Sequence, residues 1–155
     1  MRKIVIGLSG GMDSATLLGK YLHEKWEVHC CTFYYGSKHG VWENRAAENL
    51  IDFYRDHNFP VIGHVIDLTK AFLDFRSNLL MSGGEIPEGH YESENMEQTV
   101  VPSRNLVFSA IMAGIAESIG ASFIALGVHS GDHHIYPDCR EEYIQSLSDT
   151  MHLAT

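Results

Sequence analysis

The chain has 155 residues, the length of one domain with a core of its own. It is 45% hydrophobic and 20% charged, which is typical of a soluble globular protein and excludes a disordered one. Eleven basic and twenty acidic residues give a net charge of −9, so no broad positive field would draw the protein onto nucleic acid or an anionic membrane. A small anionic ligand would need a local trap, such as a cluster of backbone amides.

The cysteines and the N-terminus indicate a compartment. Three cysteines, of which Cys30 and Cys31 are adjacent, cannot make a disulfide framework, so we expect a reducing cytoplasm. Because Cys30 and Cys31 alternate faces of a predicted strand, we expect both to be packing residues. No apolar run is long enough to span a membrane, and Met1 to Lys3 lead directly into a predicted strand, so no membrane contact is expected.

Strands and helices are predicted to alternate along the chain. In chain order we expect a strand over residues 3–8, a helix opened by the capping side chains Asp13 and Ser14, a strand over 28–35, a helix over 42–57, a strand over 61–66, a helix whose first turn holds Pro102, a strand over 122–128 and a helix over 140–152. Such alternation is typical of parallel βαβ units. Near-continuous apolar strands such as IVIGL and FIALGV suit a sheet covered on both faces. The sequence therefore predicts an α/β fold with a doubly wound, Rossmann-like parallel sheet.

One stretch does not follow this alternation. Residues 77–100 carry Gly83, Gly84, Pro87 and Gly89 with a Glu-rich tail. We expect a surface insertion or lid there, within a single domain over residues 1–155.

The turn after the first strand has the chemistry of a phosphate cradle. In a doubly wound sheet, ligands bind beyond the carboxyl ends of the strands, and Ser9-Gly10-Gly11-Met12-Asp13-Ser14 lies at such a place. The two glycines let the backbone turn tightly and expose N–H groups, and the following helix adds the positive end of its dipole. Ser9 and Ser14 offer hydroxyl donors, and Asp13 can hold a magnesium ion.

The residues that are missing narrow the interpretation. No lysine follows the glycines as a Walker A loop requires, and GxGxxG is absent. The loop is therefore interpreted as a grip on a pyrophosphate that leaves, and SGGxDS after a strand resembles the PP-loop of ATP pyrophosphatases such as GMP synthetase, asparagine synthetase and NAD synthetase. The alternative is a plain strand-to-helix turn. Residues 82–84 repeat the SGG tripeptide with neither a strand before it nor Asp-Ser after it.

Two further polar clusters occur in the second half of the chain. Arg104 and Asn105 open a predicted helix, where they can bind a carboxylate or phosphate, or serve only as a surface arginine and a cap. GVHSGDHHIYPDCR, residues 127–140, follows the last predicted strand and suggests a ligand pocket. A metal site is the alternative there, although its candidate ligands fit no standard zinc spacing. Those candidates are His129, Asp132, His133 and Cys139.

Taken in order, SGGMDS, YYGSKHGVWE, VPSRN and GVHSGDHHIYPDCR are similar to the landmarks of the 7-cyano-7-deazaguanine synthase (QueC) family of queuosine biosynthesis, over nearly the whole chain. YPDCR is the most discriminating element. The resemblance implies an adenine nucleotide α-hydrolase-like fold and an ATP-dependent C–N ligase. In that reaction ATP adenylates 7-carboxy-7-deazaguanine with release of pyrophosphate, ammonia displaces AMP to give an amide, and a second ATP drives dehydration to the nitrile, preQ0. It also implies a homodimer that acts on a small molecule and does not bind nucleic acid directly.

The resemblance also implies roles for individual residues. The ATP phosphates would be bound by Leu8, Ser9, Gly10, Gly11, Met12, Asp13 and Ser14, with magnesium on Asp13. The catalytic residues would be Asp13, Lys38, His39 and Arg104. The substrate pocket would be formed by Tyr35, Asn105, His129, Asp132, Tyr136, Asp138 and Arg140.

This sequence departs from the family pattern in three ways. The family usually has Gly at Ser103, and Gln-Arg at Ser37-Lys38. Family members also continue into a segment with a four-cysteine zinc site, whereas this sequence has no CxxC pair, so its zinc ligands are not present in these residues. Both a fragment and a naturally short form would produce this pattern.

Other functions stay open from the sequence. A variant enzyme would stop at the amide, and a non-catalytic module would bind ATP without turnover. A tRNA thiolase or amidotransferase-coupled synthetase is disfavoured by the charge of −9 and the absence of a CxxC pair. The residues do not separate tRNA from DNA as the end use of the product.

Overall fold

The structure is a computed structural model that describes residues 1–86, 94–128 and 136–154. Its centre is a four-stranded sheet in the order β3-β2-β1-β4, in which every pair is parallel. The strands are β1 (Lys3–Gly7), β2 (Glu27–Tyr34), β3 (Val61–Asp67) and β4 (Ile124–Ala125). The chain runs outward from β1 to β3 and then returns to the other side of β1, which confirms the predicted doubly wound sheet.

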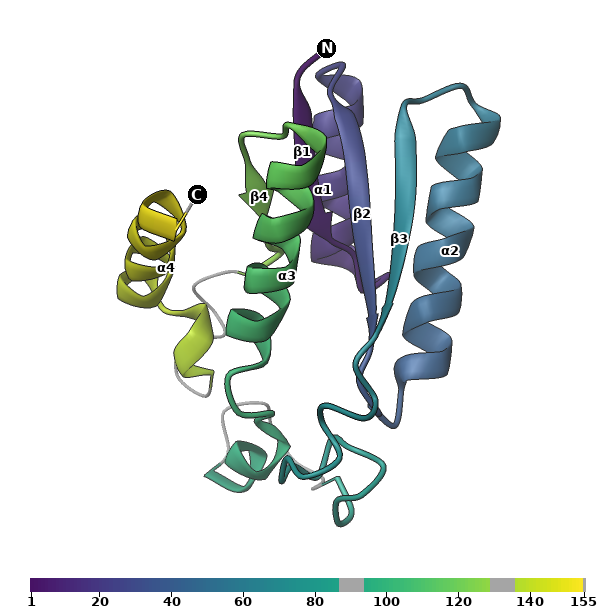
Figure 1. Ribbon diagram of the computed structural model, residues 1–155. Coiled ribbons are helices and arrows are strands. Elements are labelled where there is room, and N and C mark those ends of the chain that lie inside the picture. The colour runs from purple at the N-terminus through teal and green to yellow at the C-terminus, as the bar shows by residue number, and fades with distance from the viewer. Residues whose placement is uncertain (87–93, 129–135, 155) are drawn as a thin grey trace.

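Helices cover both faces of this sheet (Figure 1). On one face lie α1 (Met12–His23) and α2 (Gly40–Asp56), and on the other lies α3 (Arg104–Ile119). The last helix, α4 (Glu141–Ala154), follows the short 3-10 helix η3 (Pro137–Cys139) and contacts α3. A second 3-10 helix, η1 (Glu94–Thr99), precedes α3 near the carboxyl ends of the strands.

The alternation of side chains along the strands builds two cores, one for each face. Ile4 and Ile6 of β1 pack with Leu18 and Leu22 of α1, whereas Val5 between them belongs to the core under α3. Each core is completed by the apolar stripe of its helices, because isolated helices of this length depend on such packing.

Cys30 and Cys31 are fully buried, one in each core, which confirms that both pack. Burial raises the pKa of the Cys31 thiol to about 12 and that of Cys30 further above its usual range. Both groups therefore stay neutral at physiological pH, and neither is an activated nucleophile.

Two helix starts differ from the prediction. The N-cap of α1 is Gly11, and no side chain caps it; Ser14 instead donates its hydroxyl to the Gly11 carbonyl at 3.1 Å. Pro102 lies before α3 rather than in its first turn, because Ser103 turns the chain with a φ of 52°. The last strand is also much shorter than predicted, with two paired residues, Ile124 and Ala125, in place of the expected 122–128.

The stretch Glu97–Ile119, which joins the end of η1 to α3, is long and apolar enough, by length and composition alone, to cross a membrane. Within this stretch, Met112 and Ala116 of α3 are buried against the sheet. This is the packing of a core helix in an α/β domain, and such helices meet the same length criterion.

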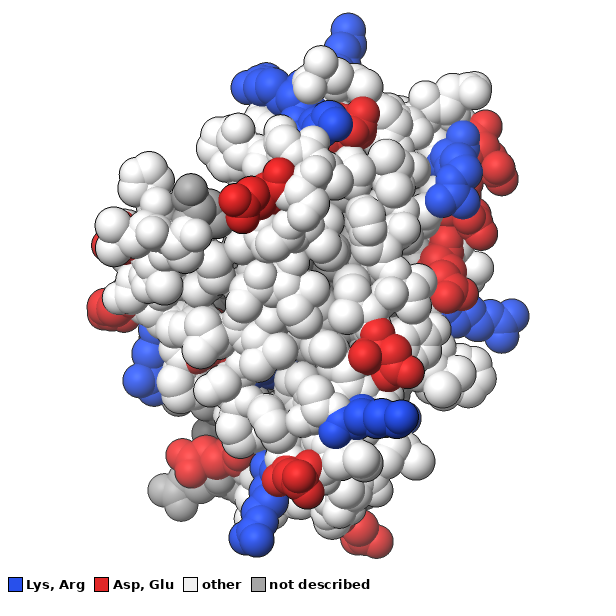
Figure 2. Space-filling view, viewed as in Figure 1, with Lys and Arg blue, Asp and Glu red and all other residues white. Residues whose placement is uncertain are grey.

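The face that carries α3 is mostly uncharged (Figure 2). Basic and acidic side chains are interspersed over it, mainly around its margin, and they do not separate into areas of one sign. This distribution matches the sequence-based expectation that attraction of an anionic ligand depends on local donors rather than on a broad field.

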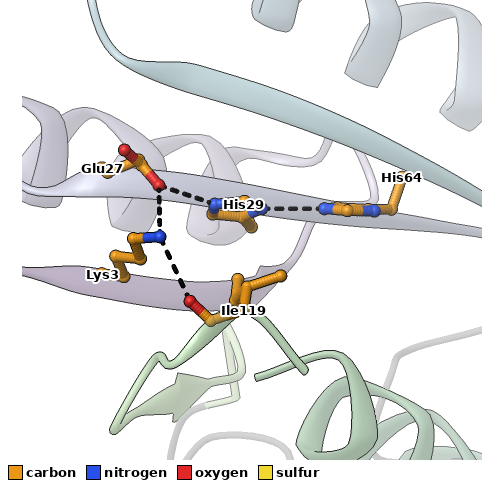
Figure 3. Close-up of polar contacts among 5 residues, drawn as sticks. All are labelled: Lys3, Glu27, His29, His64 and Ile119. Carbon is orange, nitrogen blue, oxygen red and sulfur yellow. Dashed lines mark hydrogen bonds and ion pairs between the residues drawn. The ribbon is translucent and has the colours of Figure 1, made fainter. Parts of the chain in front are cut away.

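A chain of polar side chains crosses the sheet on the α3 side (Figure 3). Lys3 of β1 donates to the carbonyl of Ile119 at 3.1 Å and lies 3.4 Å from the carboxylate of Glu27. Nε2 of His29 lies 3.0 Å from that carboxylate, and Nδ1 of His29 lies 2.9 Å from Nε2 of His64. Because the carboxylate only accepts hydrogen bonds, Nε2 of His29 is the donor toward Glu27. In neutral His29 the Nδ1 atom then accepts the proton of His64.

These polar contacts make the free energy of unfolding depend on pH. Burial, and then the neighbouring His29, lower the pKa of His64, and the hydrogen bond from His29 lowers the pKa of Glu27. The unfolded chain therefore binds protons more readily at both groups. The stability that these two groups contribute is complete above their unfolded pKa values and is lost as the pH falls. We expect the free energy of unfolding, measured in urea, to fall as the pH is lowered from about 7 to 5.

The variant His64→Gln should flatten this slope, because it removes one of the two titrations. The exposed His23 offers a matched control, and His23→Gln should keep the slope of the unmodified chain. Equal slopes for the unmodified chain and His64→Gln would contradict the assignment.

Candidate nucleotide and substrate site

A cavity of about 540 Å³ opens at the carboxyl edge of the sheet. Its walls come from the loops after β1 and β4, the end of β2, the starts of α2 and α3, and η3. The loops after β1 and β4 lie on opposite sides of the point where the strand order reverses, which is where doubly wound sheets bind ligands.

The first wall is the loop between β1 and α1. The hydroxyl groups of Ser9 and Ser14 are hydrogen-bonded, with their oxygens 3.1 Å apart, and the Gly11 N–H donates to the Ser9 hydroxyl at 3.3 Å. Beside this loop, a Cβ placed on Gly127 would lie 3.0 Å from the amide nitrogen of Ser14. The loop is therefore held by its own serines, and the backbone after β4 closes in on the first turn of α1.

Gly10 and Gly11 have different places in this loop. Gly10 has a φ of +81°, and a Cβ there would lie 2.7 Å from both the Cβ of Ala46 and the carbonyl oxygen of Glu43. Its backbone is therefore pressed against α2, while Gly11 lines the cavity. Of the predicted phosphate-binding residues, Leu8, Ser9, Gly11, Asp13 and Ser14 line the cavity. Gly10 and Met12 are outside this lining, and the Met12 side chain is 82% exposed.

Asp13 presents its carboxylate from the first turn of α1 and lines the cavity. Among the residues that the structure describes, no three His, Cys, Asp or Glu side chains are placed to hold a metal ion together. A single carboxylate suits magnesium, which usually takes its remaining ligands from phosphates and water. The magnesium role of Asp13 stays a prediction.

Arg104 and Tyr35 form a second wall. The guanidinium donates to the phenol oxygen of Tyr35 at 3.3 Å and lies 5.8 Å from its ring centroid. Burial works against the charge on Arg104, but Tyr35, Asp138 and Tyr136 outweigh it and raise its pKa further. The cavity thus contains a permanent cation held in place by an aromatic ring.

The start of α3 is held by residues more than thirty positions later in the chain. The backbone N–H of Asn105 donates to Oδ2 of Asp138 at 3.1 Å. The side-chain amide of Asn105 donates to the Asp138 carbonyl at 3.4 Å and lies 3.7 Å from Sγ of Cys139. Asn105 and Cys139 line the cavity. Asp138, whose contact with substrate stays a prediction, accepts a backbone N–H of the first turn of α3, and it is not among the lining residues.

Tyr136 connects η3 to the segment before α3. Its hydroxyl lies 3.2 Å from the hydroxyl of Thr99, and both residues line the cavity. Tyr136 was predicted from the sequence, whereas Thr99 was not.

The remaining predicted site residues are spread more widely. His39 lines the cavity, but Lys38 donates from its ammonium group to the carbonyls of Asn78, at 2.8 Å, and Gly84. Lys38 is therefore engaged with the 77–84 segment and is absent from the lining. Arg140 is exposed and also outside the lining. His129 and Asp132 lie outside the described residues, as does His133 of the alternative metal site.

Sequence reasoning also missed part of the lining. Asn44 and Glu43 of α2 contribute, and so do Phe33 and Phe108, whose rings stack with centroids 3.9 Å apart. One signal was available for Asn44, since it shares the buried face of α2 with Ala47 and Ile51 and is a polar residue at an apolar position. The aromatic pair left no such signal, because its members belong to different elements.

The fold and this cavity define a class, namely a doubly wound α/β protein with a glycine-rich loop at its topological switch point. The family described as "Queuosine biosynthesis protein QueC" matches residues 3–155, and the chain belongs to it.

Curated relatives agree with this family. A protein of Desulfotalea psychrophila is 46% identical over 151 residues, which are 97% of this chain and 67% of the relative. A protein of Pseudoalteromonas atlantica is 38% identical over 154 residues, covering 99% of this chain and 68% of the relative. A protein of Methanoregula boonei is 39% identical over 151 residues, covering 97% of this chain and 67% of the relative. All three are named 7-cyano-7-deazaguanine synthase, and the chain spans about two thirds of their length.

The contact of Gly10 with α2 should make this position intolerant of a side chain. In Gly10→Ala, a Cβ would meet backbone atoms of α2 and would also force a positive φ on a residue that disfavours it. We expect a loss of about 2–4 kcal/mol in the free energy of unfolding, measured by urea denaturation. Gly114 is the matched control, because nothing lies within 4 Å of its added Cβ. Gly114→Ala should be neutral or stabilising, and equal effects at the two positions would contradict the proposed contact.

Ser103 should respond in the opposite direction. It has a φ of 52° just before α3, a conformation that glycine adopts without strain. We expect Ser103→Gly to raise the free energy of unfolding by about 1 kcal/mol, after the larger unfolded-state entropy of glycine is subtracted. Ser118→Gly in the last turn of the same helix should lower it, because that residue is α-helical. Destabilisation by Ser103→Gly would show that the left-handed turn is not strained.

Proposed function

We propose that the chain binds ATP at residues 8–14 and converts 7-carboxy-7-deazaguanine, with ammonia, to 7-cyano-7-deazaguanine. The observation that carries the proposal is one cavity lined by four distant segments, which supply Asp13, Tyr35, Arg104 and Tyr136. The names of the curated relatives support the same activity.

The chemistry requires an activated carboxylate, because ammonia does not displace oxide from a carboxylate anion. A carboxylate oxygen attacks the α-phosphorus of ATP, and the bond to the leaving pyrophosphate breaks. Ammonia then attacks the acyl carbon of the adenylate, AMP leaves, and a proton is lost to give the amide. In the second round the amide oxygen attacks another ATP, pyrophosphate leaves, and loss of AMP and protons forms the nitrile.

The residues of the cavity suit these charges. The serine-held loop and the start of α1 offer donors to the pyrophosphate as negative charge accumulates on it. Arg104, which keeps its charge in the cavity, would stabilise either the substrate carboxylate or the oxygens of the α-phosphate. A magnesium ion on Asp13 would neutralise the phosphates and make pyrophosphate a better leaving group.

The same cavity can hold a flat base. Phe33 and Phe108 stack with ring planes within 3° of each other, and Tyr35 lies edge-on to Phe108. All three line the cavity with Arg104. Aromatic walls with a few polar groups are typical of sites for planar heterocycles. We assign the deazapurine to this side and the phosphates to the loop.

We place this activity in a reducing cytoplasm and in a homodimer. All three cysteines are free and buried, so none is required as a disulfide. The dimer rests on the family resemblance alone. With a net charge of −9, a free small molecule is a better substrate than a nucleic acid.

The direct test is mass spectrometry of the product from 7-carboxy-7-deazaguanine, ATP, magnesium and ammonia, with AMP and pyrophosphate measured in parallel. We expect the nitrile with two AMP released for each product molecule. Asp13→Ala should reduce magnesium-dependent pyrophosphate release by at least about 100-fold without unfolding the chain, because it removes the expected magnesium ligand. Asp56→Ala, at the exposed end of α2, is the control and should keep the original rate.

Each other outcome has a defined meaning. Accumulation of the amide would identify an enzyme that performs only the first adenylation. ATP bound without turnover would favour the non-catalytic module, and no ATP binding would overturn the proposal. Full turnover by Asp13→Ala would remove Asp13 from the site.

A further inference from the structure

The cavity is lined by a residue whose buried amide nitrogen has no hydrogen-bond partner among the described residues. This residue is Asn44, which is 3% exposed; its Nδ2 atom is shielded from solvent and lacks a hydrogen-bond partner within residues 1–86, 94–128 and 136–154. Five buried side-chain nitrogen or oxygen atoms of the described residues lack a partner, and of these residues only Asn44 lines this cavity. The others are Trp26, Thr32, Ser109 and Tyr143.

Its position in α2 is one that packing alone would give to an apolar side chain. Asn44, Ala47 and Ile51 share the buried face of the helix. Leaving a buried N–H without an acceptor costs folding free energy, whereas an apolar side chain of similar shape would not. The amide therefore opposes the stability of the empty protein and would be satisfied by an acceptor supplied from the cavity.

The turn of α2 that carries Asn44 is the one that touches the glycine-rich loop. Gly10 packs against Glu43 and Ala46, on either side of Asn44 in the sequence. Because Glu43 also lines the cavity, an anionic ligand on this side needs donors that offset a nearby carboxylate. A neutral amide is such a donor, and a half-turn about its Cβ–Cγ bond exchanges nitrogen for oxygen without moving the backbone.

We propose that Asn44 is a phosphate-binding residue whose side-chain amide donates a hydrogen bond to the phosphate chain of ATP gripped by the loop. This inference rests on the proposed binding of ATP at residues 8–14. It adds α2 to the phosphate site and separates this end of the cavity from the end that holds Arg104 and the aromatic rings.

The test is isothermal titration of the full 155-residue chain with magnesium–ATP and with pyrophosphate, alongside a thermal melt without ligand. Asn44→Leu keeps the size of the side chain and removes its donors. We expect Kd for both ligands to rise about tenfold or more, with the melting temperature unchanged or higher. Kd for 7-carboxy-7-deazaguanine should stay the same. Asn49→Leu, on the exposed side of the same helix, should change none of these values.

The outcomes distinguish this inference from the proposed function. If the unmodified chain binds ATP and Asn44→Leu binds it equally well, Asn44 has no role in binding, while the function stands. If the unmodified chain does not bind ATP, the proposed function itself fails. Weakened binding of the deazapurine alone would overturn the phosphate assignment.

A second variant covers the case in which Asn44→Leu does not fold. Asn44→Asp keeps the shape and replaces the donor with a negative charge. It should weaken ATP more than leucine does, and increasingly so as the pH rises through the carboxyl pKa. Unchanged ATP affinity in Asn44→Asp would overturn the inference as well.

Discussion

The close contact between Gly10 and α2 fixes the geometry of the whole site. Only a residue without a side chain can hold a φ of +81° with its backbone against Glu43 and Ala46. Because that contact anchors the loop, Gly11 and the first turn of α1 face the cavity rather than the helix behind them. The positions of Asp13 and Ser14 follow from it.

The opposite walls are fixed by polar contacts between distant segments. Tyr35, just after β2, accepts from Arg104, and the carboxylate of Asp138 accepts the backbone N–H of Asn105 in the first turn of α3. Each contact satisfies a group that a helix start or a buried cation would otherwise leave unpaired. The site is therefore organised by partners far apart in sequence, which favours a cavity that is already formed before a ligand enters.

The features that could be predicted from the sequence are those that depend on residues close together in the chain. Apolar periodicity and glycine placement predicted the alternation of strands and helices, the doubly wound sheet and the loop at residues 9–14, since each depends on neighbours within a few positions. Position 103 shows the limit, because the left-handed turn that moves the start of α3 past Pro102 is not visible in the composition around it. The brevity of β4 is likewise decided by its pairing with β1, which local composition does not encode.

The chemistry of individual side chains was harder to predict than their neighbourhood. The sequence placed Lys38 and Asp138 near a site, but not their partners, the carbonyls of the 77–84 segment and the start of α3. Those partners are set by tertiary packing, and a polar side chain near a site is as available to the fold as to a ligand. Asn44 is the reverse case, in which the fold leaves a donor unused.

The bond from Asn105 to Asp138 also bears on how the protein is made. The ribosome delivers β1, α1, β2, α2 and β3 first, and these elements already share a core of local βαβ units. The first turn of α3, by contrast, waits for an acceptor 33 residues further along the chain. The sheet can thus begin to consolidate on a nascent chain while its binding cavity is still open on one side, and the cavity closes only once η3 has emerged from the ribosomal tunnel.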